Sequence, residues 1–351
     1  MDAFKNQISP ELIALIADHL ERHLPGFDRD SFTQGLTQKL APLALKERVT
    51  LVADAMHLVL PQDFTARARI LAAMLHPDEL HHANQPSDAD GLCGWGVWPL
   101  SDMIARYGLA QFEASLALLK EVTKRGTAEF DVRPFLVQDQ DRALAIIAGW
   151  VHDPNHHVRR LVSEGTRPRL PWGIRLQGLI QDPTPTLALL KTLRDDPSDY
   201  VRRSVANHLN DIAKDHRDLV ARLATDWLDG APAERQRLIR HACRTLIKQG
   251  HQQVLAAFGY YAPLIAWPTI TIQSTIVHYG AGLDFAVALC SSSDQPQQLM
   301  LDYLVHFKKA NGTHRAKIFK WTKVELPPKR ICNLTRHHPI KPITTRSYYA
   351  G

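Results

Sequence analysis

Two different hydrophobic periodicities divide this chain. Up to about residue 255 apolar side chains recur three and four positions apart, as in residues 201–209, which predicts amphipathic helices. Beyond that point apolar and polar residues alternate, as in residues 299–307, which predicts β-strands. We therefore predict an α-helical domain over residues 1–255 and a small all-β, immunoglobulin-like sandwich over residues 256–351.

A repeated sequence refines the helical prediction. The run DPNHHVRRLV that starts at Asp153 matches the run DPSDYVRRSV that starts at Asp196 at six positions, with a period of 43 residues. This period is typical of HEAT repeats, helical hairpins that stack into a solenoid. The alternative is a chance similarity between two amphipathic helices. We predict a HEAT-like repeat solenoid whose repeated helix begins at Asp153 and ends by Gly165.

The arginines of this repeat are candidate phosphate ligands. Second helices of HEAT hairpins line the concave face of the solenoid, where guanidinium groups can hold phosphate by two hydrogen bonds. The alternative is that they pair with Asp153 and Asp196 of the same turns. The candidates are Arg159, Arg160, Arg202, Arg203 and Arg240.

Charge is concentrated near the C-terminus. The whole chain carries a formal net charge of +6, but residues 306–346 hold eleven lysines and arginines and one acid, Glu325. Such a stretch predicts a surface for a polyanion, although basic strand edges also prevent unwanted strand pairing. The predicted DNA contacts here are Lys308, Lys309, Lys317 and Lys320.

No sequence pattern indicates a metal, a cofactor or a membrane span. The four cysteines lack C-x-x-C spacing, and we expect Cys290 and Cys332 to be free thiols in a cytoplasmic protein. The chain has no phosphate-binding loop and no dinucleotide fingerprint. Histidines and a cysteine that could bind a metal lack zinc spacing, so we expect no metal: His76, His81, His82, Cys93, His156 and His157.

Two loops before predicted helices have unusual compositions. Residues 91–102 hold two tryptophans among three glycines, and we expect Ser101 or Asp102 to cap the helix that follows. Residues 129–135, EFDVRPF, place two carboxylates and an arginine around an apolar anchor. The alternative for this second loop is a simple hydrophobic staple at a helix start.

A third segment breaks a local rule. Glu164 is predicted at the C-terminus of a helix, where the helix dipole makes a carboxylate unfavourable. It is followed by Arg167, Arg169 and Trp172. Glu164 therefore either belongs to an internal ion-pair cluster or places a negative charge and an aromatic face beside a basic groove, an arrangement that suits a cationic ligand on a polyanion.

These motifs carry a family resemblance. The runs SEGTRPRLPW and EFDVRPFL closely resemble the bacterial DNA alkylation repair glycosylases of the HEAT-like-repeat superfamily, in particular the AlkC family. The runs DYLVHFKKANGTHRAKIFKW and TTRSYYAG resemble the immunoglobulin-like domain of one branch of that family. The resemblance implies a monofunctional DNA glycosylase, and we expect a monomer because the solenoid caps itself and the net charge is well away from zero. It would release small cationic bases, chiefly N3-methyladenine, from duplex DNA without full base flipping.

The resemblance also implies site residues. Glu129 and Glu164 would be the catalytic carboxylates, and Trp172 the aromatic contact. Asp102, four residues after Trp98, resembles the Trp-x-x-x-Asp arrangement of the sister AlkD family. Because alkylation at N3 already makes the purine a good leaving group, the enzyme need only stabilise the oxocarbenium-like sugar and position water. Arg167 and Arg169 are expected to contact DNA.

Two other function classes remain open at this stage. A non-catalytic HEAT-repeat scaffold for nucleic acid or protein would release no base, and a scaffold for protein would show little salt sensitivity. An RNA-binding protein would prefer single strands to a bent duplex.

Overall fold

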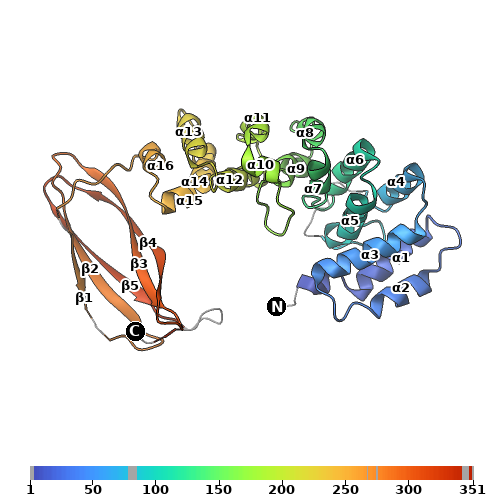
Figure 1. Ribbon diagram of the computed structural model, residues 1–351, viewed down its shortest axis with the longest axis horizontal. Coiled ribbons are helices and arrows are strands. Elements are labelled where there is room, and N and C mark those ends of the chain that lie inside the picture. Colours follow the sequence, from blue (N-terminus) through green and yellow to red (C-terminus); the bar gives the residue numbers. More distant parts are fainter. Residues whose placement is uncertain (1–3, 78–84, 267, 274–275, 342–347, 350–351) are drawn as a thin grey trace. The chain divides into compact units, whose positions relative to one another are not determined.

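The computed structural model describes residues 4–77, 85–266, 268–273, 276–341 and 348–349. Within them, helices fill the chain up to Ala257 and strands follow from Thr269 (Figure 1). The first eight α-helices are α1 (Pro10–Glu21), α2 (Arg29–Thr37), α3 (Leu45–Val59), α4 (Phe64–Ala73), α5 (Trp98–Tyr107), α6 (Phe112–Thr123), α7 (Arg133–Gln138) and α8 (Gln140–Ala148). The next eight are α9 (His156–Gly165), α10 (Gln177–Gln181), α11 (Thr184–Leu193), α12 (Asp199–Ile212), α13 (Arg217–Leu228), α14 (Ala233–Ala242), α15 (Arg244–Lys248) and α16 (Gln252–Ala257). Two 3₁₀ turns are η1 (Phe4–Gln7) and η2 (Gly94–Val97).

Internal contacts divide the chain into two compact units. The first comprises Met1–Val220 with Gly230–Cys243, and the second comprises Ala221–Asp229 with Arg244–Gly351. The second unit thus contains α15 and α16 as well as the strands. A domain boundary at residue 256 stays a prediction.

The two copies of the 43-residue repeat fold in the same way at their starts. The Asp153 carboxylate accepts a hydrogen bond from the backbone N–H of Asn155 at 2.9 Å, and Asp196 accepts one from Ser198 at 2.8 Å. Asn155 then caps α9. The repeated helix therefore begins three residues later than predicted, because Asp153 shapes the turn before the helix and does not belong to it.

The first arginine of each repeated pair is part of this turn. Arg159 donates to the carbonyls of its own Asp-Pro step at 2.9 and 3.0 Å, and Arg202 repeats the arrangement at 2.5 and 2.9 Å. Arg159 also pairs with Asp196 of the next repeat at 2.6 Å. Both arginines thus contact the Asp-Pro step of their own turn, and their contact with DNA stays a prediction. Arg203 differs, since two-thirds of its side chain is exposed and it pairs with Asp199 on its own helix.

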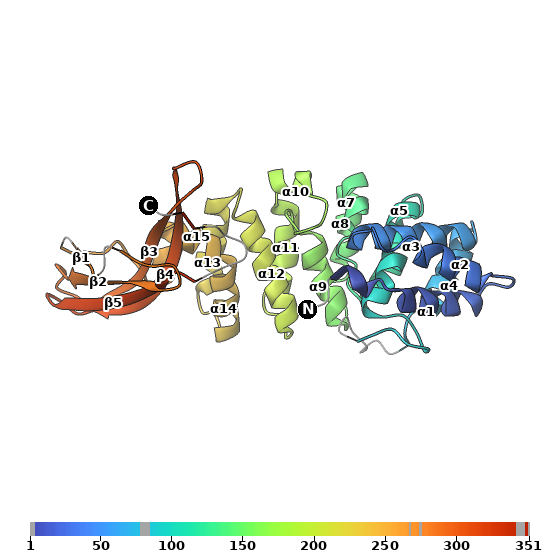
Figure 2. The same ribbon diagram turned by 90° about the horizontal axis from the view of Figure 1, so that it is seen from below.

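Apolar faces of the repeated helices hold the helical unit together. α9 packs against α6. It also packs against α11 and α12, and α12 packs against α14 (Figure 2). The buried residues have the predicted helical spacing, with Val158, Leu161 and Val162 on α9 and Val201 and Val205 on α12. This packing places the C-terminus of α9 beside the middle of α12.

The strands form two antiparallel sheets. They are β1 (Thr269–Ile272), β2 (Gly282–Cys290), β3 (Gln297–Lys308), β4 (His314–Leu326) and β5 (Ile331–Pro339). One sheet has the order β1-β2-β5 and the other pairs β3 with β4. Apolar side chains of both sheets share one core, which includes Val287, Leu289, Leu299 and Leu326. The alternation rule found the first four strands, and β5 was not predicted.

The cysteines of this sandwich are free thiols, as expected. Leu289 of β2 lies opposite Cys332 of β5, and Cys290 lies opposite Ile331. Both cysteines therefore lie on neighbouring strands of one sheet, and a bond between them would not bridge the two sheets. Of the predicted C-terminal motif TTRSYYAG, only Tyr348 and Tyr349 lie within the described residues.

Candidate active site

The C-terminus of α9 is the centre of a buried ion cluster. The Glu164 side chain accepts hydrogen bonds from Arg167 at 2.7 Å and from Ser204 on α12 at 2.6 Å. Arg160, one turn earlier on α9, lies 3.4 Å from the same carboxylate. Glu164 is only 6% exposed, and the dipole at the end of the helix disfavours its negative charge. The two arginines stabilise that charge.

Glu129 joins the cluster from the loop before α7. Its carboxylate accepts a hydrogen bond from Arg160 at 3.0 Å, and the same guanidinium donates to the Thr127 hydroxyl at 2.7 Å. The ring of Tyr200 lies 4.8 Å from Arg160. One arginine therefore bridges two buried carboxylates that lie 35 residues apart in the sequence.

Asp211 extends the cluster along α12 and was not predicted. It is 2% exposed and accepts hydrogen bonds from Arg167 and from Lys214, each at 2.8 Å. The 43-residue repeat places α12 beside α9, but no local motif marks this position. Arg167 is therefore buried between two carboxylates, and its predicted contact with DNA would require it to leave them. Arg169 points elsewhere and pairs with Asp215 at 2.7 Å.

The environment pushes the pKa values of the two glutamates in opposite directions. Burial raises the pKa of Glu129, and the nearby Glu164 adds to this although Arg160 opposes it. Burial also acts on Glu164, but Arg160, Arg167 and the Ser204 hydroxyl outweigh it, so the pKa of Glu164 lies below its ordinary value. Such a divided pair suits one carboxylate that stays ionised and one that can take up a proton.

Arg133 connects this cluster to the loop that follows it. Its side chain is fully buried and donates to the carbonyls of Gly165, Arg167 and Ile174 at 2.8, 2.8 and 2.6 Å. The arginine of the EFDVRPF run therefore fixes the backbone on both sides of Trp172. The composition of the EFDVRPF run is unusual, but nothing in the sequence predicts these backbone contacts of Arg133.

Trp172 is held in an unfavourable position. Its φ is +65°, a left-handed conformation that disfavours residues other than glycine, and 66% of its surface is exposed. The Lys46 ammonium donates a hydrogen bond to its backbone carbonyl. An exposed aromatic ring on strained backbone is a frequent feature of binding sites.

A cavity of about 230 Å³ opens beside this tryptophan. Asp102 is in its wall, on the second turn of α5, which begins at Trp98 with Pro99 in its first turn. Ser101 and Asp102 are therefore inside the helix, and the prediction that either caps it is wrong. Burial raises the pKa of Asp102, although the nearby Arg106 opposes the shift. The cavity is lined by Lys46, Val49, Thr50, Trp98, Asp102, Ala105, Arg106, Phe130, Asp131, Pro134, Trp172, Gly173 and Ile174.

Asp131 is the most perturbed carboxyl group of this wall. Only 3% of the residue is exposed, and burial raises its pKa to about 8. Its Oδ2 atom has no hydrogen-bond partner among the residues that the structure describes. Near neutral pH the group is thus a protonated acid with an unsatisfied polar atom, which is costly unless something else completes it.

Replacing Asp131 by asparagine should change how stability depends on pH. The folded protein keeps the Asp131 proton up to about pH 8, whereas the unfolded chain releases it near pH 4. Stability from this group is therefore lost as pH rises from about 4 to 8, by at most about 1.4 kcal/mol per pH unit. Asparagine does not ionise, so Asp131→Asn should become more stable relative to the wild type across this window. Urea unfolding at pH 5, 6.5 and 8 checks this, and parallel curves for both proteins would contradict it.

Within the described residues, the candidate metal ligands His76, Cys93, His156 and His157 do not form one group. His81 and His82 lie outside the described residues, and His156 packs on His157 with ring centroids 4.2 Å apart. The Cys93 thiol is buried and donates to the Pro86 carbonyl, and burial raises its pKa.

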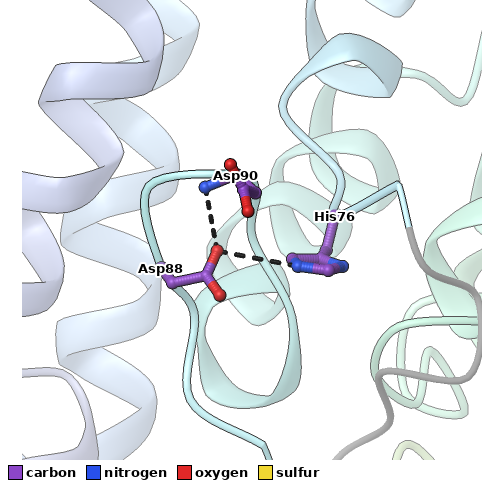
Figure 3. Close-up of side chains that lie close together, drawn as sticks. All are labelled: His76, Asp88 and Asp90. Atoms are coloured by element: carbon purple, nitrogen blue, oxygen red, sulfur yellow. Dashed lines mark hydrogen bonds and ion pairs between the residues drawn. The ribbon is translucent and has the colours of Figure 1, made fainter.

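A different group of possible metal ligands includes His76. Its ring, Asp88 and Asp90 offer three ligand atoms within 4.8 Å of one another (Figure 3). Asp88 lies 3.6 Å from His76 and accepts the backbone N–H groups of Asp90 and Gly91. These contacts account for the fold of this loop.

The basic segment forms a cavity of about 810 Å³ in the second unit. β3 and β4 are antiparallel neighbours, so the end of β3 lies beside the start of β4. Lys308, the adjacent Lys309, Arg315 and Lys317 all line this cavity. Lys248 of α15 also lines the cavity. Lys320, also predicted, is not among its lining residues.

Three comparisons with known proteins find similar sequences and structures. Residues 267–351 match the protein family described as "Uncharacterised protein YhaZ, C-terminal Ig-like domain". The protein YhaZ of Bacillus subtilis (strain 168) is 37% identical, over 100% of this chain and 94% of its own length. The structure of Pseudomonas fluorescens alkylpurine DNA glycosylase AlkC, bound to DNA containing an abasic site analog, has a TM-score of 0.84 at 34% identity. It covers 99% of this chain and 93% of that chain.

These matches confirm the predicted fold class, a HEAT-like repeat domain followed by an immunoglobulin-like domain. Within the described residues, no helix is both long and apolar enough to span a membrane. The likeness extends over helices and strands alike, at identities that indicate common descent. The chain therefore belongs to the AlkC family of HEAT-like-repeat DNA glycosylases, in the branch that carries a C-terminal immunoglobulin-like domain.

Proposed function

We propose that this protein is a monofunctional DNA glycosylase that hydrolyses the N-glycosidic bond of small cationic alkylated bases, chiefly N3-methyladenine, in duplex DNA. The observation that carries the proposal is the pair of buried carboxylates, Glu129 and Glu164, bridged by Arg160. Family membership supports the reaction class. We also propose that the protein acts as a monomer.

The divided pKa values suggest separate roles. Glu164, whose pKa is lowered, would stay ionised and stabilise the positive charge that develops on the sugar. Glu129, whose pKa is raised, would accept a proton from the attacking water. No group has to protonate the departing base, because the alkylated purine is already cationic.

Arg160 would control when the carboxylates act. In this structure its guanidinium neutralises both glutamates. A DNA phosphate close to Arg160 would compete for the guanidinium and leave the carboxylates to the cationic sugar. Chemistry at the sugar also agrees with action without full base flipping, since neither Glu129 nor Glu164 lines the cavity beside Trp172.

Incubation with methylated genomic DNA tests the proposal. We expect the purified protein to release N3-methyladenine, identified by chromatography and mass spectrometry, and to leave abasic sites without strand breaks. Arg203 is the exposed arginine of α12 and stays a candidate DNA contact. Arg203→Ala should change the affinity for DNA but not the identity of the released base. A protein that binds DNA but releases no base would be a scaffold, and the proposal would be wrong.

Replacing Trp172 by alanine should weaken recognition of the lesion selectively. An exposed cation–π contact contributes about 0.5–2 kcal/mol, so affinity for a duplex with a cationic abasic-site analogue should fall by about 2- to 30-fold. Affinity for the undamaged duplex should be almost unchanged. Fluorescence anisotropy with both duplexes measures this. Tyr261→Ala, which removes an exposed aromatic ring from elsewhere, is the control, and equal losses for both duplexes would contradict a lesion contact.

A further inference from the structure

The cavity beside Trp172 has the walls of a site for a flat ring. Trp98 and Phe130 stack with centroids 5.7 Å apart and an angle of 26°, and both line the cavity together with the exposed Trp172. Its volume of about 230 Å³ is below the range of pockets for drug-sized ligands, so it fits one small ring system. Aromatic faces of this kind bind nucleobases by stacking.

One carboxyl oxygen of this wall lacks a hydrogen-bond partner, although the same Asp131 side chain is hydrogen-bonded to Ser101. Asp131 is 97% buried, and its Oδ2 atom makes no hydrogen bond to any residue within the described ranges. The Lys46 ammonium, which also lines the cavity, is engaged by the Trp172 carbonyl. A ligand that accepts or donates a hydrogen bond at the edge of a ring would complete Asp131.

We propose that this cavity binds the alkylated purine after it leaves the sugar, with the ring against Trp98 and Trp172 and Asp131 as its hydrogen-bond partner. The inference rests on the proposed glycosylase function and extends it to a product site. A protonated Asp131 would donate to a ring nitrogen, as carboxylic acids do in apolar sites.

Binding of the free base tests the proposal. Free 3-methyladenine should quench tryptophan fluorescence of the full-length protein saturably and inhibit its release of base from methylated DNA. Asp131→Asn keeps the shape and a donor and should bind the base within about 3-fold of the wild type. Asp131→Leu should bind it at least 10-fold more weakly. Asp30→Asn changes an exposed aspartate elsewhere and is the control. A melting curve for each variant identifies any that fail to fold, and Trp98→Phe provides an independent change of the wall.

Three outcomes separate the possibilities. Saturable binding that is lost in Asp131→Leu supports the product site, even if the wild type releases no base, in which case only the proposed glycosylase function fails. If the wild type releases N3-methyladenine but millimolar free base neither quenches nor inhibits, the product site is wrong and the glycosylase function stands. Protection of the cavity tryptophans by duplex with an abasic site, but not by free base, would assign the cavity to the sugar and overturn the inference.

Discussion

Glu164→Gln is expected to lower the single-turnover release of N3-methyladenine by about 100-fold or more. The substitution keeps the shape and an acceptor for Ser204 but removes the negative charge that would stabilise the oxocarbenium-like sugar. Affinity for duplex DNA should hold or increase, because a negative charge near phosphate is lost. Single-turnover kinetics, duplex affinity and melting temperature are measured on one preparation.

A matched substitution separates chemistry from structure. Asp196→Asn removes another buried, ion-paired carboxylate, the partner of Arg159, without touching the glutamate pair. Comparable loss of melting temperature in both variants, with loss of base release only in Glu164→Gln, would assign a catalytic role. If base release by Glu164→Gln stays near the wild-type rate, Glu164 is not catalytic, and Glu129 or Asp102 becomes the candidate. A parallel fall of stability, binding and release would make Glu164 a structural partner of Arg167.

Removing four cations from the cavity of the immunoglobulin-like domain is expected to weaken binding to every duplex, damaged or not. Each phosphate contact contributes about 0.9 to the slope of log affinity against log salt concentration, so the slope should fall by up to about 3.6. Binding isotherms between 50 and 200 mM salt measure it. The residues changed to alanine are Lys308, Lys309, Arg315 and Lys317.

The control variant removes the same charge from the helical region. If the slope of log affinity against log salt is unchanged in the cavity variant, or falls equally in the control, the immunoglobulin-like domain does not bind DNA through these cations. The control residues are exposed and are changed to alanine: Lys39, Arg69, Lys191 and Arg217.

Periodicity predicted the architecture because burial repeats along each element. The 43-residue repeat correctly placed α9 and α12 as equivalent helices, and the alternation of residues 299–307 marked β3. The start of α5 was predicted incorrectly, because the helix begins at Trp98 and not after Ser101 or Asp102. Pro99 was the available signal, since proline is common in the first turn of a helix. Strand β5 was missed as well, although it carries its own weak alternation from Ile331 to Pro339.

The site was only partly predictable, because its members converge from distant elements. The sequence offered Glu164 two alternatives, an ion-pair cluster or a charge beside a groove. The structure supports the cluster, in which Glu164 pairs with Arg167. Arg169 pairs with Asp215 instead. No local pattern could reveal that Asp211 approaches Arg167, because that contact depends on the register between two packed helices.

The backbone of Trp172 has a consequence for how tightly any ligand can be held. A left-handed conformation at this residue costs about 1–2 kcal/mol, and the Lys46 hydrogen bond and the Arg133 contacts on both sides keep it from relaxing. Folding therefore orders this loop before a ligand binds. Binding energy gained on the indole face is therefore not spent on ordering the backbone of this loop, which is the part of the site that is preorganised.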